Sequence, residues 1–204
     1  MRRAPVWAAL MVAAAAFLLY HATLLPGFDL GDTASFQAVA GSSLVSPRDA
    51  YPLYFAIAGL LLKIIGGDPA RALNVITALE SAAACGLLTL LGVELSGSIA
   101  AGIAAALLFA GSYTFWSQSV ITEVYGLHIA FVALTLWLLL RWEKRPTTSR
   151  LACFFAVYAL GFGNHLSMIL LAPGFTLFLL LAAPDGWRSM FAWRVIGQIG
   201  RAHV

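Results

Sequence analysis

The sequence predicts an all-α integral membrane protein, a bundle of about six spans with surface or re-entrant helices in its first loop. First, 61% of its 204 residues are hydrophobic and only 10% are charged, whereas soluble domains carry about 25% charged residues. Second, the apolar residues form runs of about 20, the length that crosses a bilayer as a helix. Third, no alternating ten-residue strands interrupt these runs, which favours a helical bundle over a barrel.

The charges are few, and they lie mainly in short loops between the apolar runs. The net charge of +3 therefore reports on membrane topology and does not indicate a nucleic-acid surface. Cys85 and Cys153 both lie inside apolar runs, where a thiol packs as a small hydrophobe. We therefore expect no disulfide framework, no metal site and no nucleic-acid partner.

The first apolar run covers residues 4–25 and follows Arg2 and Arg3. Its first half resembles a signal peptide, but Tyr20 stands where a cleavage site before Thr23 needs a small residue. We therefore expect a retained first span with a cytoplasmic N-terminus, in a bacterial inner membrane.

The loop after this span carries Asp32, where a short helix over residues 33–45 is expected to begin. Phe36, Val39 and Leu44 recur at a spacing that suits a helix lying on the membrane surface. Two compatible roles for Asp32 stay open. It caps the helix, because an aspartate oxygen satisfies an orphan N–H of the first turn, or it is a catalytic carboxylate.

Residues 51–65 form an apolar run of fifteen, shorter than the usual spanning minimum of about 17. Whether this run crosses the bilayer decides on which side every later loop lies. If it crosses, the basic loop 141–150 lies outside, against the positive-inside rule. We therefore predict a re-entrant or interfacial helix, which puts this loop in the cytoplasm with Arg2 and Arg3.

Five further spans are expected, at residues 70–95, 98–115, 124–141, 151–163 and 166–183. Together with the first span, they place several polar residues at the outer ends of the helices. These residues are Asp32, Tyr51, Gln118, Glu123, Asn164 and His165. Glu80 differs because it lies well inside the second span, where an ionisable group is either functional or paired with another helix.

Three polar stations interrupt the apolar runs on the outer side. The first combines Gly-Asp-Thr (31–33) with Tyr-Pro-Leu-Tyr (51–54). The second is Phe-Trp-Ser-Gln-Ser-Val-Ile-Thr-Glu-Val-Tyr (115–125), and the third is Gly-Asn-His-Leu-Ser (163–167). Singly, each has an ordinary explanation as interfacial aromatic anchors, a solvated carboxylate or a polar helix break. Together, three stations on one side suit a single broad cavity built from several helices.

In this order, the motifs resemble those of a bacterial and animal family of multi-span membrane proteins, formerly a domain of unknown function. That family belongs to the GT-C class of glycosyltransferases and includes an animal O-mannosyltransferase acting on plexin-type receptor domains. The resemblance includes the start of a span at residues 71–74 and covers most of the chain from Asp32 to about Pro173. Its most specific parts are residues 116–125 and 164–165.

The resemblance implies a GT-C-like bundle whose first extracytoplasmic loop carries the catalytic aspartate, here Asp32. It implies inverting transfer of a sugar, mannose being the first candidate, from a polyprenyl-phosphate donor to an exported protein or envelope glycan. Asp32 would accept the proton of the acceptor hydroxyl; no resident cofactor is expected, and a divalent cation requirement stays open. The residues expected to bind substrate or donor are Glu123, His165, Asn164, Gln118, Tyr51, Tyr54, Trp116, Tyr125, Arg48 and Arg71.

The chain departs from the family pattern at two places. Where the family has Asp-Ser/Thr-Gly-Glu, the sequence from Asp32 reads Asp-Thr-Ala-Ser and lacks the second acidic residue. The usual His-Pro-Pro-Gly is replaced by Ser-Pro-Arg-Asp-Ala at residues 46–50, which removes a histidine. Arg48 is expected to replace that histidine beside a leaving phosphate, which needs donors or cations near it.

Two other function classes stay open. A membrane transporter would use Glu80 as its coupling charge, although the polar residues gather on one side and no inverted repeat is visible. A non-catalytic membrane assembly subunit would tolerate polar substitutions at the outer ends of the helices.

The last six residues, Ile199 to Val204, read as the translation of a sequencing adapter. We therefore expect them to be non-native. Residues 1–198 are expected to be the N-terminal part of a longer multi-span GT-C-like domain.

Overall fold

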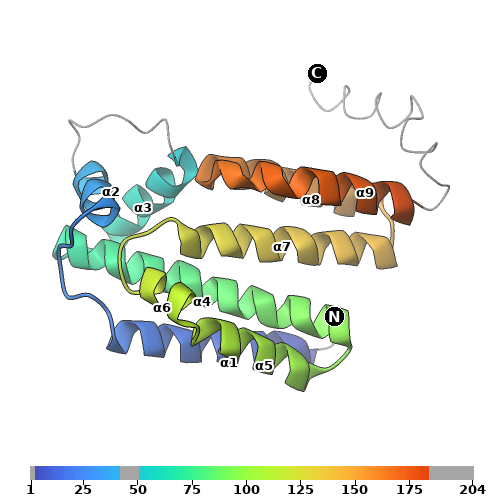
Figure 1. Cartoon of the computed structure of the whole chain (residues 1–204), viewed down its shortest axis with the longest axis horizontal. Helices are drawn as coiled ribbons and strands as arrows, with labels where there is room; N and C mark the ends of the chain where they lie inside the picture. The colour runs from blue at the N-terminus through green and yellow to red at the C-terminus, as the bar shows by residue number, and fades with distance from the viewer. Residues whose placement is uncertain (1–2, 42–50, 184–204) are drawn as a thin grey trace.

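The computed structural model describes residues 3–41 and 51–183, which fold as helices without a strand (Figure 1). The all-α prediction is confirmed. Residues 1–2, 42–50 and 184–204 lie outside the described part. They include Arg48 and the last six residues, 199–204. The helices are α1 (Arg3–Ala22), α2 (Asp32–Gly41), α3 (Pro52–Ile65), α4 (Pro69–Ser96), α5 (Ile99–Ala110), α6 (Tyr113–Ser119), α7 (Tyr125–Lys144), α8 (Thr148–Asn164), the 3-10 helix η1 (Leu166–Leu171) and α9 (Ala172–Ala182).

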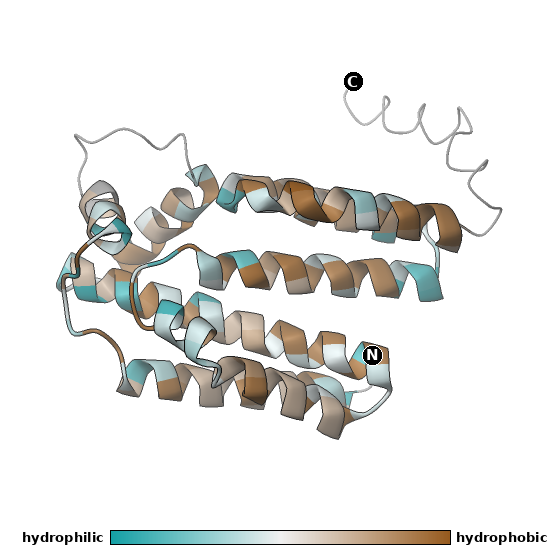
Figure 2. Ribbon diagram, viewed as in Figure 1, coloured by the Kyte–Doolittle hydropathy of each residue, from teal (hydrophilic) through white to brown (hydrophobic). Residues whose placement is uncertain are grey.

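Three of the described helices, α1, α4 and α7, are long and apolar enough to cross a membrane. The span predicted at residues 98–115 is not one straight helix, because the chain bends by 69° between α5 and α6. These two helices count as a fourth span only if taken together. α8, with 17 residues, and the segment Leu166–Ala182 are shorter, so length and composition support fewer than the predicted six. In Figure 2, hydrophobic residues lie along the middle of the long helices, and many of the hydrophilic residues lie near the helix ends.

The central helix is α4, which packs against α1, α5 and α7. Small residues set how closely the helices approach. A Cβ added at Gly102 of α5 would lie 2.7 Å from the carbonyl oxygen of Thr89, and one added at Gly86 would lie 3.1 Å from the carbonyl oxygen of Ala9. Such contacts are typical of membrane bundles, where small side chains let helix backbones come together.

A second cluster joins α8 and α9 to α7. Trp142 of α7, Phe154 of α8 and Phe175 of α9 are all buried in it. The rings of Phe154 and Phe175 meet edge to face, with centroids 5.3 Å apart. These helices therefore extend the bundle beyond α7, as Figure 1 shows.

α1 and α4 are antiparallel, which decides the place of α3. Asn74, near the start of α4, hydrogen-bonds the backbone just after α1, whereas Gly86, farther along, meets Ala9. α1 therefore ends where α4 begins, and α3 lies at that same end (Figure 1). The structure thus agrees with the prediction that residues 51–65 do not cross.

The bundle consequently has two chemically different ends. The polar end contains Asp32, Tyr51, Glu123 and His165. The basic end, at the α4–α5 and α7–α8 turns, contains Glu94, Arg141, Lys144, Arg145 and Arg150.

Candidate active site at the polar end

A buried hydrogen-bond network holds three separate segments together at the polar end. The Gln37 side-chain amide of α2 donates to Asn74 Oδ1 over 3.1 Å and lies 3.2 Å from Thr122 Oγ1. Thr122 in turn donates to Asn74 Oδ1 over 2.6 Å. Because none of these side chains is more than 4% exposed, their mutual bonds satisfy groups that would otherwise be costly to bury.

The same network reaches the backbone of the first loop and of the α6–α7 loop. Asn74 Nδ2 donates to the carbonyl oxygens of Leu25 and Gly27, both at 2.9 Å. The backbone N–H of Glu123 donates to Thr77 Oγ1 over 3.2 Å. The loops that carry Asp32 and Glu123 are therefore both anchored on the first turns of α4.

Asp32 is the first residue of α2, and its side chain is exposed. Among the described residues, no N–H donates to its carboxylate, so the capping bond that the sequence allowed is not formed there. The carboxylate still lies at a helix N-terminus, where the helix dipole favours negative charge. Asp32 thus presents an open carboxylate at the polar end.

Glu123 is a second carboxylate in the same region, but it is only 8% exposed. Burial raises the pKa of Glu123 to about 7; the negative charge of Asp32 adds to this rise, and a hydrogen bond from the Val124 N–H opposes it. The two carboxyl groups are therefore close enough to repel and differ in environment. Such a difference lets paired carboxyls hold different protonation states.

Aromatic rings form a wall beside these carboxylates. The His165 ring lies 5.6 Å from that of Tyr51, 5.9 Å from that of Tyr125 and 4.9 Å from that of His128, measured between centroids. Phe36 of α2 contacts Tyr51 edge to face. Three segments that are distant in sequence, the start of α3, the start of α7 and the α8–η1 junction, thus meet at His165, and α2 packs against this group through Tyr51.

Neighbouring polar atoms hold His165 in place. Its Nδ1 accepts a hydrogen bond from the Ser167 N–H over 3.2 Å, so a neutral His165 carries its proton on Nε2. The preceding residue, Asn164, is fully buried and donates to the Val124 carbonyl oxygen over 3.2 Å. The α8–η1 junction is therefore fixed to the start of α7.

Residues 32–187 match the model of the protein O-mannosyl-transferase TMEM260 N-terminal domain family. The chain belongs to this family. The mouse protein O-mannosyl-transferase TMEM260 is 32% identical over 154 residues, which is 75% of this chain but 22% of the mouse protein. The chain therefore spans about a fifth of this relative's length. No solved structure matches it.

Family membership confirms the predicted resemblance, and the matched region begins at Asp32. Of the residues expected to bind substrate, Tyr51, Tyr125 and His165 come together. Glu123 is near Asp32, and Asn164 lies inside the bundle as a structural anchor. Their chemical roles stay predictions.

Four other residues that the sequence predicted to bind substrate form no hydrogen bond or ring contact with His165 in the described part of this TMEM260-family chain. Trp116 donates from Nε1 to Thr23 Oγ1 over 2.9 Å and so ties α6 to the end of α1. Tyr54 is fully buried. Gln118 is half-buried, and Arg71 is exposed in the first turn of α4. Arg48 lies outside the described residues.

The sequence reasoning missed Gln37, Thr77 and His128. His128 follows Tyr125 by three positions in α7 and therefore shares its face, a spacing that could have found it. His128 Nε2 lies 2.9 Å from Ser167 Oγ. Gln37 and Thr77 are neutral residues inside helices, and nothing in their spacing distinguishes them.

Glu80 of α4 is 7% exposed, and within the described residues neither of its carboxyl oxygens has a hydrogen-bond partner. The same holds for the hydroxyl of Tyr54 and for Asn164 Oδ1. Of the two roles left open for Glu80, an interhelical hydrogen bond is therefore not found in this part of the TMEM260-family domain, and a functional role stays a prediction.

Proposed function

We propose that the protein is a GT-C-type membrane glycosyltransferase that transfers a sugar, with mannose as first candidate, from a polyprenyl-phosphate donor. The acceptor is a Ser or Thr of an exported protein, or an envelope glycan. Membership of the TMEM260 family supports glycosyl transfer. The observation that carries the proposal is the exposed Asp32 carboxylate, anchored beside Glu123 at one end of membrane-length helices.

In the proposed reaction, Asp32 acts as general base. It takes the proton of the acceptor hydroxyl as that oxygen attacks the anomeric carbon. The new carbon–oxygen bond forms on the face opposite the bond to phosphate, which breaks, and its electron pair leaves with the polyprenyl phosphate. The sugar is thereby inverted.

The neighbouring residues supply binding and charge stabilisation in this scheme. The rings of Tyr51 and Tyr125 offer surfaces on which a sugar stacks, and Glu123 offers oxygens to its hydroxyl groups. The departing phosphate gains negative charge and needs donors nearby. His165 takes that role through Nε2, and we assign Arg71, exposed in the first turn of α4, to the more distant charge of the lipid-linked phosphate.

We further propose that the polar end faces away from the cytoplasm. The basic end carries Arg141, Lys144, Arg145 and Arg150, and α1 begins at that end (Figure 1). Positive charge beside short loops favours the cytoplasmic side. This orientation gives a cytoplasmic N-terminus and an inner-membrane enzyme acting on exported acceptors.

The test is Asp32→Asn in the full-length protein, assayed in membranes for mannosyl transfer from polyprenyl-phosphate mannose. Asp29→Asn is the matched control, because Asp29 is in the same loop and its Oδ1 accepts only a local bond from Leu30 N–H among the described residues. Asp32→Asn should abolish transfer at an unchanged membrane level, whereas Asp29→Asn should retain it. Full activity in Asp32→Asn removes Asp32 from the mechanism.

One observation favours a second function, a transporter with Glu80 as coupling site. Buried ionisable groups inside spans commonly mark such sites, and Glu80 lacks a partner among the described residues. A transporter predicts that Glu80→Gln stops substrate uptake in vesicles while Asp32→Asn does not. The opposite pattern, with transfer lost in Asp32→Asn alone, supports the glycosyltransferase.

A further inference from the structure

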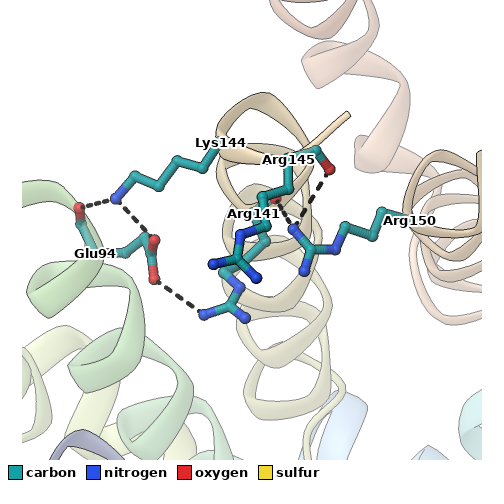
Figure 3. A pocket seen from close by; sticks show the side chains of 5 residues that line it. All are labelled: Glu94, Arg141, Lys144, Arg145 and Arg150. Carbon is teal, nitrogen blue, oxygen red and sulfur yellow. Dashed lines mark hydrogen bonds and ion pairs between the residues drawn. The ribbon is translucent and has the colours of Figure 1, made fainter. Parts of the chain in front are cut away.

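A second charged cavity lies at the basic end, away from the candidate active site. Its volume is about 270 Å³, and its walls come from the end of α4, the end of α7 and the start of α8. Figure 3 shows the five charged side chains that line it. They are Glu94, Arg141, Lys144, Arg145 and Arg150.

Four cationic side chains and one carboxylate line this cavity. Glu94 is shared between Lys144, at 2.8 Å, and Arg141, at 3.9 Å. Arg150 donates to the carbonyl oxygens of Arg141 and Arg145 over 2.8 and 3.4 Å, contacts that leave its charge unbalanced. The Arg145 guanidinium makes no ion pair with any described residue.

We propose that this cavity binds the phosphate of an anionic phospholipid headgroup. Arginine and lysine are the usual partners of phosphate oxygens, and basic pockets between membrane helices suit anionic headgroups. The position favours a lipid over a free ion, because the cavity lies where two membrane-length helices, α4 and α7, end. Leu95, next to Glu94, is 68% exposed and offers apolar surface to an acyl chain.

An aromatic side chain of α7 supports an interfacial position. The Arg141 guanidinium lies 5.3 Å from the centroid of the Trp137 ring. Tryptophan gathers where the hydrocarbon region meets the headgroups. The cations of the basic end are therefore at the depth of lipid phosphate.

The experiment measures lipid binding to the purified full-length protein by native mass spectrometry. The probes are phosphatidylglycerol, phosphatidylcholine and inorganic phosphate. Phosphatidylglycerol should bind at least tenfold more tightly than phosphatidylcholine, because only the former carries net negative charge. Equal binding of the two lipids overturns the proposal. Displacement of phosphatidylglycerol by equimolar inorganic phosphate instead assigns the cavity to the free ion.

Two variants shift affinity in opposite directions. Arg145→Gln removes a cation without an ion pair and should weaken phosphatidylglycerol binding several-fold. Glu94→Gln removes the competing carboxylate and should strengthen it. Lys63→Gln, which removes an exposed cation on α3, is the control and should change nothing. If the cations act only as a topology signal, all three variants bind alike, and the proposal fails.

Discussion

The two ends of the bundle are held together by different interactions. At the polar end, neutral buried side chains join the loops to α4, as in the bonds from Asn74 to the carbonyls of Leu25 and Gly27. At the basic end, Glu94 pairs with Lys144 near the surface, and Gly102 lets α4 and α5 approach closely. Hydrogen bonds fix direction as well as distance, which suits a reaction site. Solvated ion pairs are weaker and exchange readily, which suits a headgroup site.

The largest expected effect is on the transfer rate, compared between a carboxylate at the polar end and one at the basic end. Asp32→Asn should lower transfer by at least about 100-fold, because general bases contribute roughly 10² to 10⁴ in rate. Glu143→Gln, which neutralises an exposed carboxylate near the end of α7, should leave transfer within about twofold. Initial rates in membranes with matched protein levels measure both. Equal losses in the two variants would mean that charge at either end acts through folding alone.

The next effect tests the hydrogen-bonded anchoring of the polar end. Asn74→Ala removes the donor to the part-buried Leu25 carbonyl and one of the donors to the Gly27 carbonyl. It also removes the acceptor shared by the buried Gln37 and Thr122 side chains, so it should destabilise the protein by about 2–4 kcal/mol.

Thr135→Val is the control, since among the described residues the Thr135 hydroxyl bonds only within its own helix, to Phe131. Thermal midpoints in detergent measure both. Asn74→Ala with a midpoint like that of wild type would show that the network is dispensable.

A smaller loss should follow from crowding α4 against α5 toward the basic end. Gly102→Ala puts a Cβ 2.7 Å from the Thr89 carbonyl oxygen, so the helices must separate, at a cost of about 1–3 kcal/mol. Gly59→Ala in α3 brings its added Cβ within 4 Å of no atom in the described part of the chain and should be neutral or slightly stabilising. The same detergent melts distinguish them. Similar midpoints for the two variants would refute close α4–α5 packing.

The smallest effect concerns pH and the buried Glu123. Its pKa of about 7 exceeds the ordinary 4.5, so the folded state holds the proton more tightly than the unfolded state. The contribution of Glu123 to stability is therefore fully present below pH 4.5 and is lost as pH rises to about 7.

In Glu123→Gln, residue 123 carries no charge at any pH. The thermal midpoint of this variant should therefore rise relative to that of wild type as pH increases from 4.5 to about 7. The physical reason is that in this interval Glu123 ionises in the unfolded wild-type chain while it stays protonated in the fold, which favours unfolding, whereas the glutamine of the variant ionises in neither state. Glu143→Gln serves as control, and its curve should run parallel to that of wild type. A parallel curve for Glu123→Gln as well would show that Glu123 ionises freely in the folded protein.

Hydropathy predicted the long helices well but not every break. The run 70–95 became α4, Pro69–Ser96, because Asp68 accepts from the Arg71 N–H and Gly97 adopts a left-handed conformation at the other end. The run 98–115 instead bends by 69° at Gly111 and Ser112. Gly111 and Ser112 are a pair at which helices commonly kink, but a prediction from the hydropathy of the whole run passes over two residues.

The candidate site was predictable where a residue was chemically unusual. Asp32 and Glu123 stood out because charge is rare in this chain. Gln37 did not, because an amide in a surface helix is ordinary until it meets Thr122, which is 85 positions away. Nothing local in the sequence predicts such a partner.

The sequence by itself determined that the chain is helical and membrane-embedded and that its polar motifs gather at one side. These properties could be predicted because they depend on consecutive residues: about 20 apolar residues in a row form a span, and the charges of the short loops between spans set the topology. Only the tertiary structure decided that His165 meets Tyr51 and Tyr125, that Glu123 is buried near Asp32, and that four cations share one cavity at the other end. These depend on how α4, α7 and α8 pack, and packing is set by contacts between residues far apart in the chain.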